Sequence, residues 1–296
     1  MEALQTNTRI SLHNILVATD FSKPSTAALP FAISLAQQYG AKVFVAHALG
    51  PEPHLAVPLE PIPVSDDLVW LDAKRNLAKF VPKGSAGNPP CEAILRRGDF
   101  WGVISNVIWE NKIDLVVSGT HGRQGLKKLV LGSDAEKIYR RATCPVLSVG
   151  PRVRPVKNAG WKLKQILFPT DGSEDSLKAL PYALSFAEEN QADLILVQFI
   201  PLTPPEYRES FEASVKEKLL RLLPPEADAW CKLEFMVRFE FPAEGILRLA
   251  TERRANLIVM GVKRSAEAAV STHLPWTVAS QVIAAAPCPV LTVRGH

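Results

Sequence analysis

Short apolar runs alternate with amphipathic stretches along the first half of the chain. Residues 15–18 are continuously apolar and precede the polar pair Thr19-Asp20. A second apolar run, 43–46, lies within residues 42–48, which predict another strand. Runs of this length are typical of parallel strands that are buried on both faces. Between them, apolar residues recur at helical spacing over 25–39, where a serine at the start can cap the helix and Gly40 can end it. The pattern predicts a right-handed strand–helix–strand crossover.

The alternation continues to about residue 149. Residues 50–64 interrupt it with a series of prolines, which predicts an extended surface loop. The further elements that we expect are helices at 66–81, from 98–99 onward and at 134–141, and strands at 91–96, 114–118 and 145–149.

The pattern then restarts, which indicates an internal repeat. Residues 166–171 echo 15–20, residues 257–261 echo 115–119, and residues 288–293 echo 144–149. Each half therefore predicts an open five-stranded parallel sheet between helices, as in an α/β protein of two Rossmann-like domains. We place the first domain at 1–150, a basic linker with Pro151, Pro155 and Gly160 at 151–164, and the second domain at 165–296.

A glycine-rich basic loop joins the strand at 114–118 to the helix at 134–141. Its glycines let backbone N–H groups approach an anion, and the following helix adds unpaired N–H groups and the positive end of its dipole. Ser133 with Glu136 three residues later predicts a capping box at the helix start. The loop therefore indicates a phosphate site, and the alternative is a plain turn-rich connection.

The spacing of this loop is specific. Gly119, two residues, Gly122, nine residues and then Gly132-Ser133 resembles the ATP-binding pattern of the universal stress protein family. The string Cys144–Val149 also resembles the last strand of that family. The resemblance covers almost the whole chain, because the chain holds two copies, and it implies an adenine nucleotide alpha hydrolase-like Rossmann fold.

The resemblance also implies roles for individual residues in the first half. The phosphates would lie against the glycines of the loop and Ser133, with Arg123 supplying charge, while main-chain atoms of Ala48 would meet the adenine. Asp20 would lie near the ribose and phosphates, with Mg²⁺ as a bridging ion, and its alternative role is a turn or capping carboxylate. His47 we expect to be a satisfied histidine of the core or sheet edge. The candidate site is Thr19, Asp20, Ala48, Ser118, Gly119, Gly122, Arg123, Gly132, Ser133 and Asp134.

Asp134 departs from the family, which usually has an uncharged residue after the serine. Its carboxylate favours the helix dipole. It also opposes a triphosphate at short range unless Mg²⁺ bridges the two.

The second half has lost much of the pattern. Arg264 replaces Gly122 and Trp276 replaces Gly132, while Phe199 stands where Ala48 stands and would crowd an adenine. Thr277 aligns with Ser133 but lacks an acid three residues later. We therefore expect a degenerate second domain and one ATP per chain. The alternative is that Arg264 itself pairs with a phosphate.

Composition bears on the binding partners and the cellular compartment that we expect. A net charge of +4 gives no case for nucleic acid or membrane binding, and no apolar run approaches the ~20 residues of a membrane span. The start of the chain has no signal-peptide pattern, so we expect a cytoplasmic protein. Four cysteines at similar places in the two halves predict free, buried thiols, and no cysteine or histidine cluster indicates a metal site.

The leading hypothesis is a stress protein that binds ATP in its first domain, with the second as its partner in an internal pseudo-dimer. The resemblance implies that the last strands, 145–149 and 289–293, would pair, which would also remove two exposed sheet edges. A homodimer is left open. One alternative is a slow ATPase or nucleotide-dependent switch enzyme. Another is an apolar ligand lined by Phe199, Met260 and Trp276 in the second domain.

Overall fold

The computed structural model describes residues 9–50, 66–82, 88–120, 131–156, 160–263 and 277–294. Several residues singled out from the sequence lie outside these ranges. They are most of the proline-rich loop, Gly122 and Arg123 of the glycine loop, and Arg264 and Trp276 of the second half.

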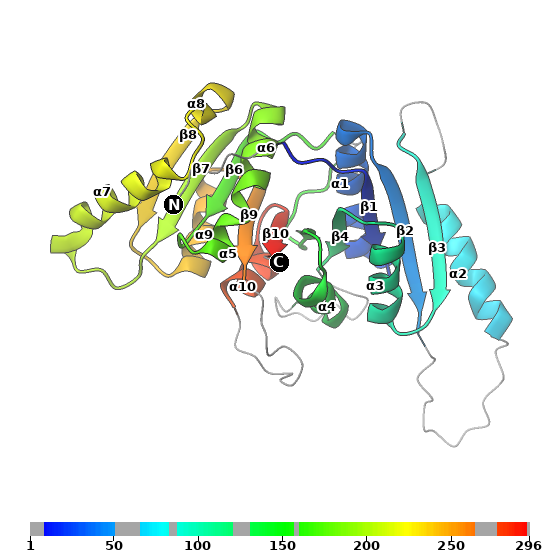
Figure 1. Ribbon diagram of the computed structural model, residues 1–296. Coiled ribbons are helices and arrows are strands. Elements are labelled where there is room, and N and C mark those ends of the chain that lie inside the picture. The colour runs from blue at the N-terminus through cyan, green and yellow to red at the C-terminus, as the bar shows by residue number, and fades with distance from the viewer. Residues whose placement is uncertain are drawn as a thin grey trace, which may run out of the picture.

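Both halves are α/β, as predicted (Figure 1). The first contains β1 (Asn14–Ala18), α1 (Lys23–Tyr39), β2 (Lys42–Leu49), α2 (Asp66–Phe80), β3 (Cys91–Arg97), α3 (Phe100–Glu110), β4 (Leu115–Gly119), α4 (Ser133–Arg141) and β5 (Val146–Val149). The second contains β6 (Gln165–Pro169), α5 (Glu174–Leu177), α6 (Leu180–Asn190), β7 (Asp193–Phe199), α7 (Pro205–Arg221), α8 (Ala227–Trp230), β8 (Leu233–Arg238), α9 (Pro242–Glu252), β9 (Leu257–Val262), α10 (Val278–Ala285) and β10 (Val290–Arg294).

The two five-stranded sheets join into one ten-stranded sheet in the order β3-β2-β1-β4-β5-β10-β9-β6-β7-β8. Strands within each half run parallel, and the joint between β5 and β10 is antiparallel, with Leu147 opposite Leu291. The last strands of the two halves therefore pair as the sequence predicted. Because of this antiparallel joint, the carboxyl ends of the first half's strands lie along the same sheet edge as the amino ends of the second half's strands.

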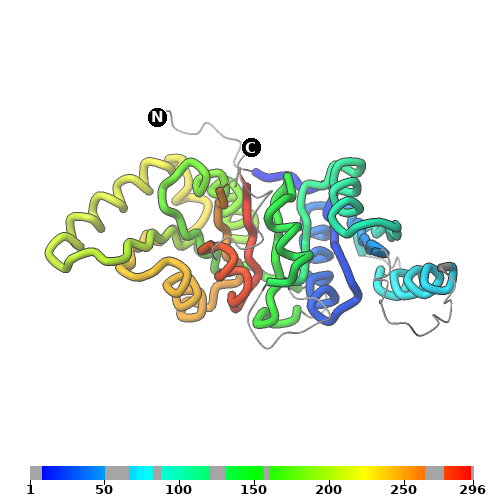
Figure 2. The backbone as a smooth tube through the Cα atoms, turned by 90° about the horizontal axis from the view of Figure 1, so that it is seen from below, coloured from blue at the N-terminus to red at the C-terminus, as the bar shows by residue number. Residues whose placement is uncertain are grey.

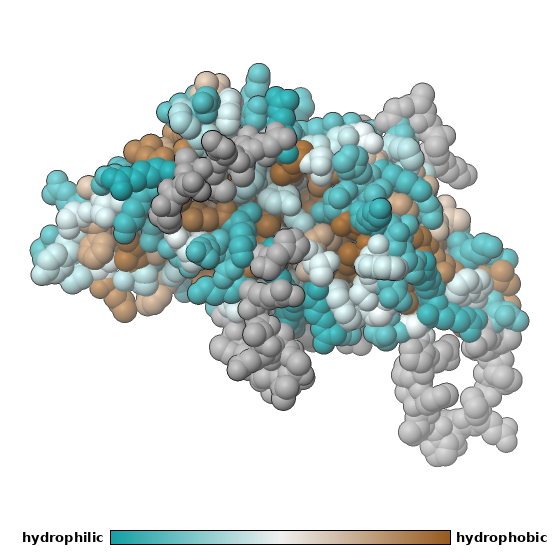
Figure 3. Space-filling view, viewed as in Figure 1, coloured by the Kyte–Doolittle hydropathy of each residue, from teal (hydrophilic) through white to brown (hydrophobic). Residues whose placement is uncertain are grey.

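Helices cover both faces of the sheet. On one face, side chains of α1, α2, α6 and α7 pack with alternate strand residues into a single core that runs through both halves. On the other face, α3 and α4 cover the first half, and α9 and α10 cover the second. In both views α2 lies at one end of the molecule and α7 at the other (Figures 1 and 2). Apolar side chains of α7, including Tyr207, Phe211 and Leu220, are exposed among polar ones at that end (Figure 3).

Local signals explain the limits of the helices, with one correction. Ser22, rather than the predicted Ser25, caps α1 by accepting a hydrogen bond from the Ser25 N–H at 3.4 Å. Gly40 ends α1 in the left-handed region at φ 66°, which favours glycine. α1 continues through Pro30, whereas in the second half the chain divides into α5 and α6 just before Pro181.

The four cysteines are free, as expected, but their burial differs. Cys231 and Cys288 are buried, and Cys91 and Cys144 are partly buried. Cys91 lies opposite Val43 in β3, whereas the equivalent position of β8 is Leu233, so Cys91 and Cys231 are not strict counterparts. Among the described helices, none combines the length and apolar character needed to cross a membrane.

The shared core predicts that the two halves unfold together. Leu147 is 1% exposed at the joint. We expect Leu147→Ala to lower the free energy of unfolding of the whole chain by about 2–5 kcal/mol, so that hydrogen exchange becomes faster in both halves. Urea denaturation followed by hydrogen exchange in each half measures this. Trp109→Ala, at a side chain that is 83% exposed, is the control and should change stability by no more than ~0.5 kcal/mol. If Leu147→Ala leaves the second half's exchange unchanged, the halves do not form one cooperative unit.

Candidate functional site

The carboxyl ends of β1, β2 and β4 bring most of the candidate residues to one sheet edge. Ala18 lies opposite Ser118 of β4 on one side and opposite Ala46 of β2 on the other. Thr19 continues from β1 by donating its N–H to the Ala46 carbonyl at 3.0 Å. Thr19, Asp20, Ala48, Ser118 and Gly119 therefore gather where parallel α/β sheets bind ligands.

The turn after β1 is tightly hydrogen-bonded. Thr19 Oγ1 accepts the Phe21 N–H at 3.0 Å and lies 3.0 Å from Ser25 Oγ, and Asp20 Oδ1 accepts the Ser22 N–H at 2.9 Å. Burial raises the pKa of the Asp20 carboxyl, but hydrogen bonds from Ser22 and Ser25 together outweigh it, so the pKa lies below its ordinary value of 3.8. A lowered pKa means that Asp20 stabilises the fold above its ordinary pKa and loses this contribution as pH falls through the folded-state value.

The second half repeats this turn. Thr170 Oγ1 accepts the Gly172 N–H at 3.0 Å and lies 2.8 Å from Ser176 Oγ, and Asp171 Oδ1 accepts the Ser173 N–H at 3.0 Å. The alternative role of Asp20 as a turn carboxylate is therefore real for one of its oxygens. Because both halves keep the turn, its presence alone does not distinguish a binding half from a degenerate one.

Phe21 and His47 belong to this edge and were not among the candidates. Phe21 has φ 61°, in the left-handed region, and its counterpart Gly172 has φ 74°. The Phe21 ring packs on His47 with ring centroids 4.3 Å apart, and His47 Nδ1 lies 2.7 Å from the Thr19 carbonyl oxygen. His47 is thus a satisfied edge histidine. The signal for Phe21 was its alignment with a glycine, which indicates an unusual backbone conformation.

Gly119 has a structural reason to be glycine. A Cβ there would lie 2.6 Å from the carbonyl carbon and oxygen of Pro24 and 2.8 Å from the Ser25 nitrogen. Gly261, its counterpart in the second half, is still tighter, with a Cβ meeting the backbone of Asp175 and Ser176. Both glycines allow the strand end to approach the start of a helix, so phosphate contact is not required to explain Gly119.

The start of α4 differs from the capping box predicted at Ser133. Gly132 is the N-cap, with φ −64° and ψ 148°, and no side chain caps the helix within the described residues. The Gly132 N–H donates to the Thr120 carbonyl at 2.8 Å, so it does not face a ligand as expected. The Glu136 N–H donates to Gly132 O at 2.8 Å. The N–H groups of Ser133, Asp134 and Ala135 are left with no acceptor in the described part of the chain.

The equivalent helix of the second half is closed. Thr277 caps α10 by accepting the Ser280 N–H at 3.2 Å, and the Ser280 hydroxyl donates to Thr277 O at 2.9 Å. Tyr139 of α4 adds a contact of 3.4 Å between its hydroxyl and Thr277 Oγ1. Among the described residues, the two repeats therefore differ at the helix start, which has no side-chain cap in α4 and is capped in α10.

The Asp134 carboxylate forms an exposed ion pair with Lys137, at 3.1 Å on the same helix. Together with the favourable helix dipole, this pair accounts for the carboxylate without a metal ion. Within the described residues, no group of three or more His, Cys, Asp or Glu side chains could hold a metal ion. Asp20 alone would therefore need nucleotide oxygens and water to complete a Mg²⁺ site.

Phe199 stands where the first half has Ala48, and a glycine on the neighbouring helix makes room for its ring. Ala48 lies opposite Arg96, and Phe199 lies opposite Arg238, so the two occupy equivalent places. A Cβ on Gly245 of α9 would lie 2.4 Å from the Phe199 ring, whereas α3 has Val103 at that position. A large residue on the strand is thus compensated by glycine on the helix. Phe199 and Met260 pack in the second half's core, and Trp276 lies outside the described residues.

The close approaches at the two glycines give a prediction about folding. Gly119→Ala and Gly261→Ala should each lower the free energy of unfolding by about 1–3 kcal/mol, because backbone atoms must shift to admit the methyl group. Gly50→Ala is the control, since a Cβ there has nothing within 4 Å. Denaturant midpoints measure all three variants. Equal stability of Gly119→Ala and the native chain would show that the β4 end does not press on α1.

Comparison with known proteins agrees with this arrangement. The sequence model of the Universal stress protein family matches residues 11–150 and again residues 162–294. A universal stress protein of Methanocaldococcus jannaschii is 29% identical over 136 residues, which cover 46% of this chain and 80% of that protein. One from Thermus aquaticus is 33% identical over 136 residues, covering 46% of this chain and 96% of that protein.

A solved structure shows the same fold over nearly the full length. The crystal structure of a universal stress protein from Archaeoglobus fulgidus has a TM-score of 0.69 to this chain, with 19% identity, and covers 95% of this chain and 98% of its own. Since the family model matches both repeats, the chain belongs to the universal stress protein family and carries two of its domains.

Proposed function

We propose that this chain binds ATP at the carboxyl edge of its first half and that the second half binds none. The observation that carries the proposal is the difference between the two helix starts. In α4 the N–H groups of residues 133–135 have no acceptor among the described residues, whereas Thr277 caps α10. An uncapped helix start beside a glycine loop suits phosphate oxygens, through its N–H groups and its dipole.

The phosphates would lie between α4 and the loop that precedes it. The hydrogen bond from Gly132 N–H to Thr120 O joins the two ends of that loop, so Ser133 sits beside the end of β4. The Ser133 hydroxyl forms no hydrogen bond in the described part of the chain and is available to a phosphate oxygen. Gly122 and Arg123 would complete the phosphate site from the loop.

The adenosine would lie over the ends of β1 and β2. Asp20 is held ionised by its lowered pKa, and one of its oxygens already accepts the Ser22 N–H. Its carboxylate would bind the ribose or a Mg²⁺ ion, which when bound neutralises phosphate charge. Ala48 has only a methyl group where the second half has Phe199, so its main chain can approach the adenine.

A titration of the native chain with ATP should give one site per chain. Gly122→Arg copies the second half's residue into the first loop, and it should abolish binding because a long side chain then occupies the phosphate approach. Trp109→Arg is the control, since it adds the same guanidinium group at an exposed position of α3 outside the candidate site. Isothermal titration calorimetry measures both stoichiometry and affinity. Two equivalent sites in the native chain would contradict the proposal, as would full affinity in Gly122→Arg.

Asp20→Asn tests the role of the carboxylate. Asparagine keeps the oxygen that accepts the Ser22 N–H, so the turn should remain intact while its charge is removed. We expect affinity for ATP with Mg²⁺ to fall roughly tenfold, and affinity measured in EDTA to stay equal or rise. Asp171→Asn, in the matching turn of the second half, should leave both affinities unchanged. An equal response of the two variants would assign Asp20 to the turn alone.

A further inference from the structure

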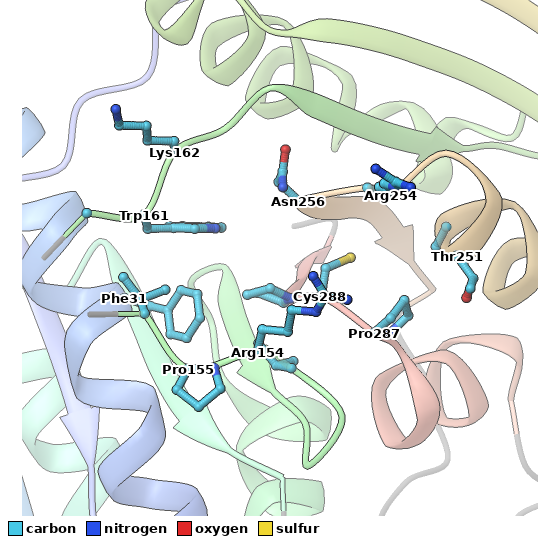
Figure 4. A pocket seen from close by; sticks show the side chains of 16 residues that line it. Phe31, Arg154, Pro155, Trp161, Lys162, Thr251, Arg254, Asn256, Pro287 and Cys288 are labelled. Carbon is cyan, nitrogen blue, oxygen red and sulfur yellow. The ribbon is translucent and has the colours of Figure 1, made fainter. Parts of the chain in front are cut away.

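A groove lies where the linker crosses between the two halves (Figure 4). Phe31 of α1 and Trp161 of the linker form one side. The segment after α9, with Arg254 and Asn256, and the segment before β10, with Cys288, form the other. Its volume is about 910 Å³, at the upper end of the range of small-molecule sites. None of the residues that line it belongs to the candidate nucleotide site.

The groove carries positive charge without nearby compensation. Arg154 reaches from the linker into the middle of the groove, and Arg254 lies on the far wall (Figure 4). Neither forms an ion pair within the described residues, and none of the described residues lining the groove is acidic. Their neighbours differ, because Arg253 pairs with Glu234, and Arg248 pairs with Glu240 and Glu252. Arg154 and Arg254 thus have no ion-pair partner among the described residues and line the groove.

Asn256 makes the case more specific, because the first half offers its counterpart. Asp114 Oδ2 accepts the N–H groups of His13 and Asn14 at 2.8 and 2.9 Å. Asn256 Oδ1 accepts those of Lys164 and Gln165 at 2.9 and 3.0 Å. Both side chains accept two backbone N–H groups from the start of a strand, but the one in the second half is a neutral amide. The amide removes a negative charge from the groove wall, and its nitrogen is a donor with no acceptor in the described part of the chain.

The opposite wall is flat and fixed. The Trp161 ring meets Phe31 edge to face, with centroids 5.1 Å apart, and the Trp161 N–H donates to Ser34 Oγ at 3.3 Å. Indole faces stack well on flat ligands, and guanidinium groups bind phosphates by paired hydrogen bonds. Lys162 points away from the middle of the groove (Figure 4). Arg154 and Arg254 are therefore the cations of the groove that we expect to contact a ligand.

We propose that this linker groove is a second ligand site and that it binds a small aromatic phosphate. The ring would lie against Trp161, and the phosphate would lie between Arg154, Arg254 and the amide of Asn256. The site is separate from the proposed ATP site, so either proposal can fail without the other.

The test uses 1-naphthyl phosphate with the full chain in isothermal titration calorimetry at low salt. We expect one site per chain, weaker binding of inorganic phosphate, and loss of affinity as ionic strength rises. Arg254→Gln and Arg154→Gln should each weaken binding roughly tenfold, by loss of a charge-assisted hydrogen bond. Lys112→Gln is the matched control, because Lys112 holds the place of Arg254 in the first half, outside the groove.

Asn256→Asp is the sharpest variant. It keeps the oxygen that accepts two backbone N–H groups, as Asp114 does, so the fold should tolerate it, and it places a negative charge in the groove. We expect affinity for 1-naphthyl phosphate to fall at least tenfold while ATP affinity stays unchanged. Absence of binding to the native chain would overturn the proposal, as would full binding in Asn256→Asp. Loss of naphthyl phosphate binding in Gly122→Arg would place the ligand in the nucleotide site and would also overturn it.

Discussion

The antiparallel pairing of β5 with β10 is the constraint on which the rest of the structure depends. Each five-stranded half ends in a strand with an open edge, and an open edge exposes unpaired backbone groups. Joining the two edges satisfies both and fuses the apolar layers into one core that includes Leu147 and Leu291. The antiparallel joint also sets the relative direction of the strands. The carboxyl ends of the first half's strands and the amino ends of the second half's strands therefore lie along the same edge of the sheet. The candidate ATP site and the linker groove follow from that arrangement.

The two repeats have kept what folding needs and have diverged where a ligand would bind. The turn at Thr19-Asp20 and the glycine at 119 recur at Thr170-Asp171 and Gly261, and each has a local structural explanation. The helix start after the loop differs between the repeats, since Thr277 caps α10 whereas no side chain of the described residues caps α4. At the amino ends of the strands it is the second half that carries the ligand-related difference. It has the neutral Asn256 where the first half has the carboxylate of Asp114. Comparison of the repeats therefore shows which features have a structural explanation common to both halves.

Much of the fold could be predicted from the sequence, because apolar runs and the internal repeat mark strands and their order. The joint between the halves was predicted from the resemblance to a family in which last strands pair, and the repeated strings at 144–149 and 288–293 located those strands. Helix caps were less predictable, since nearby serines fitted the same pattern, and Ser22 and Gly132 proved to be the caps in place of Ser25 and Ser133. The role of Gly119 could not be inferred, because its reason is an approach of β4 to Pro24, distant in sequence. The linker groove was likewise not predictable, since it joins residues from α1, the linker and two loops of the second half.

The joint between the halves also explains why a half that lacks the binding pattern would be retained. α4, whose start is the proposed phosphate site, has its carboxyl end held by Arg294 of β10, whose guanidinium donates to the carbonyls of Tyr139 and Arg140. A cation at a helix carboxyl end is favourable to the dipole, so the second half stabilises the helix that would bind the phosphates. Tyr139 in turn contacts Thr277, the residue that closes the second half's own helix. The second half therefore helps to position α4, and this structural role does not depend on a ligand site of its own.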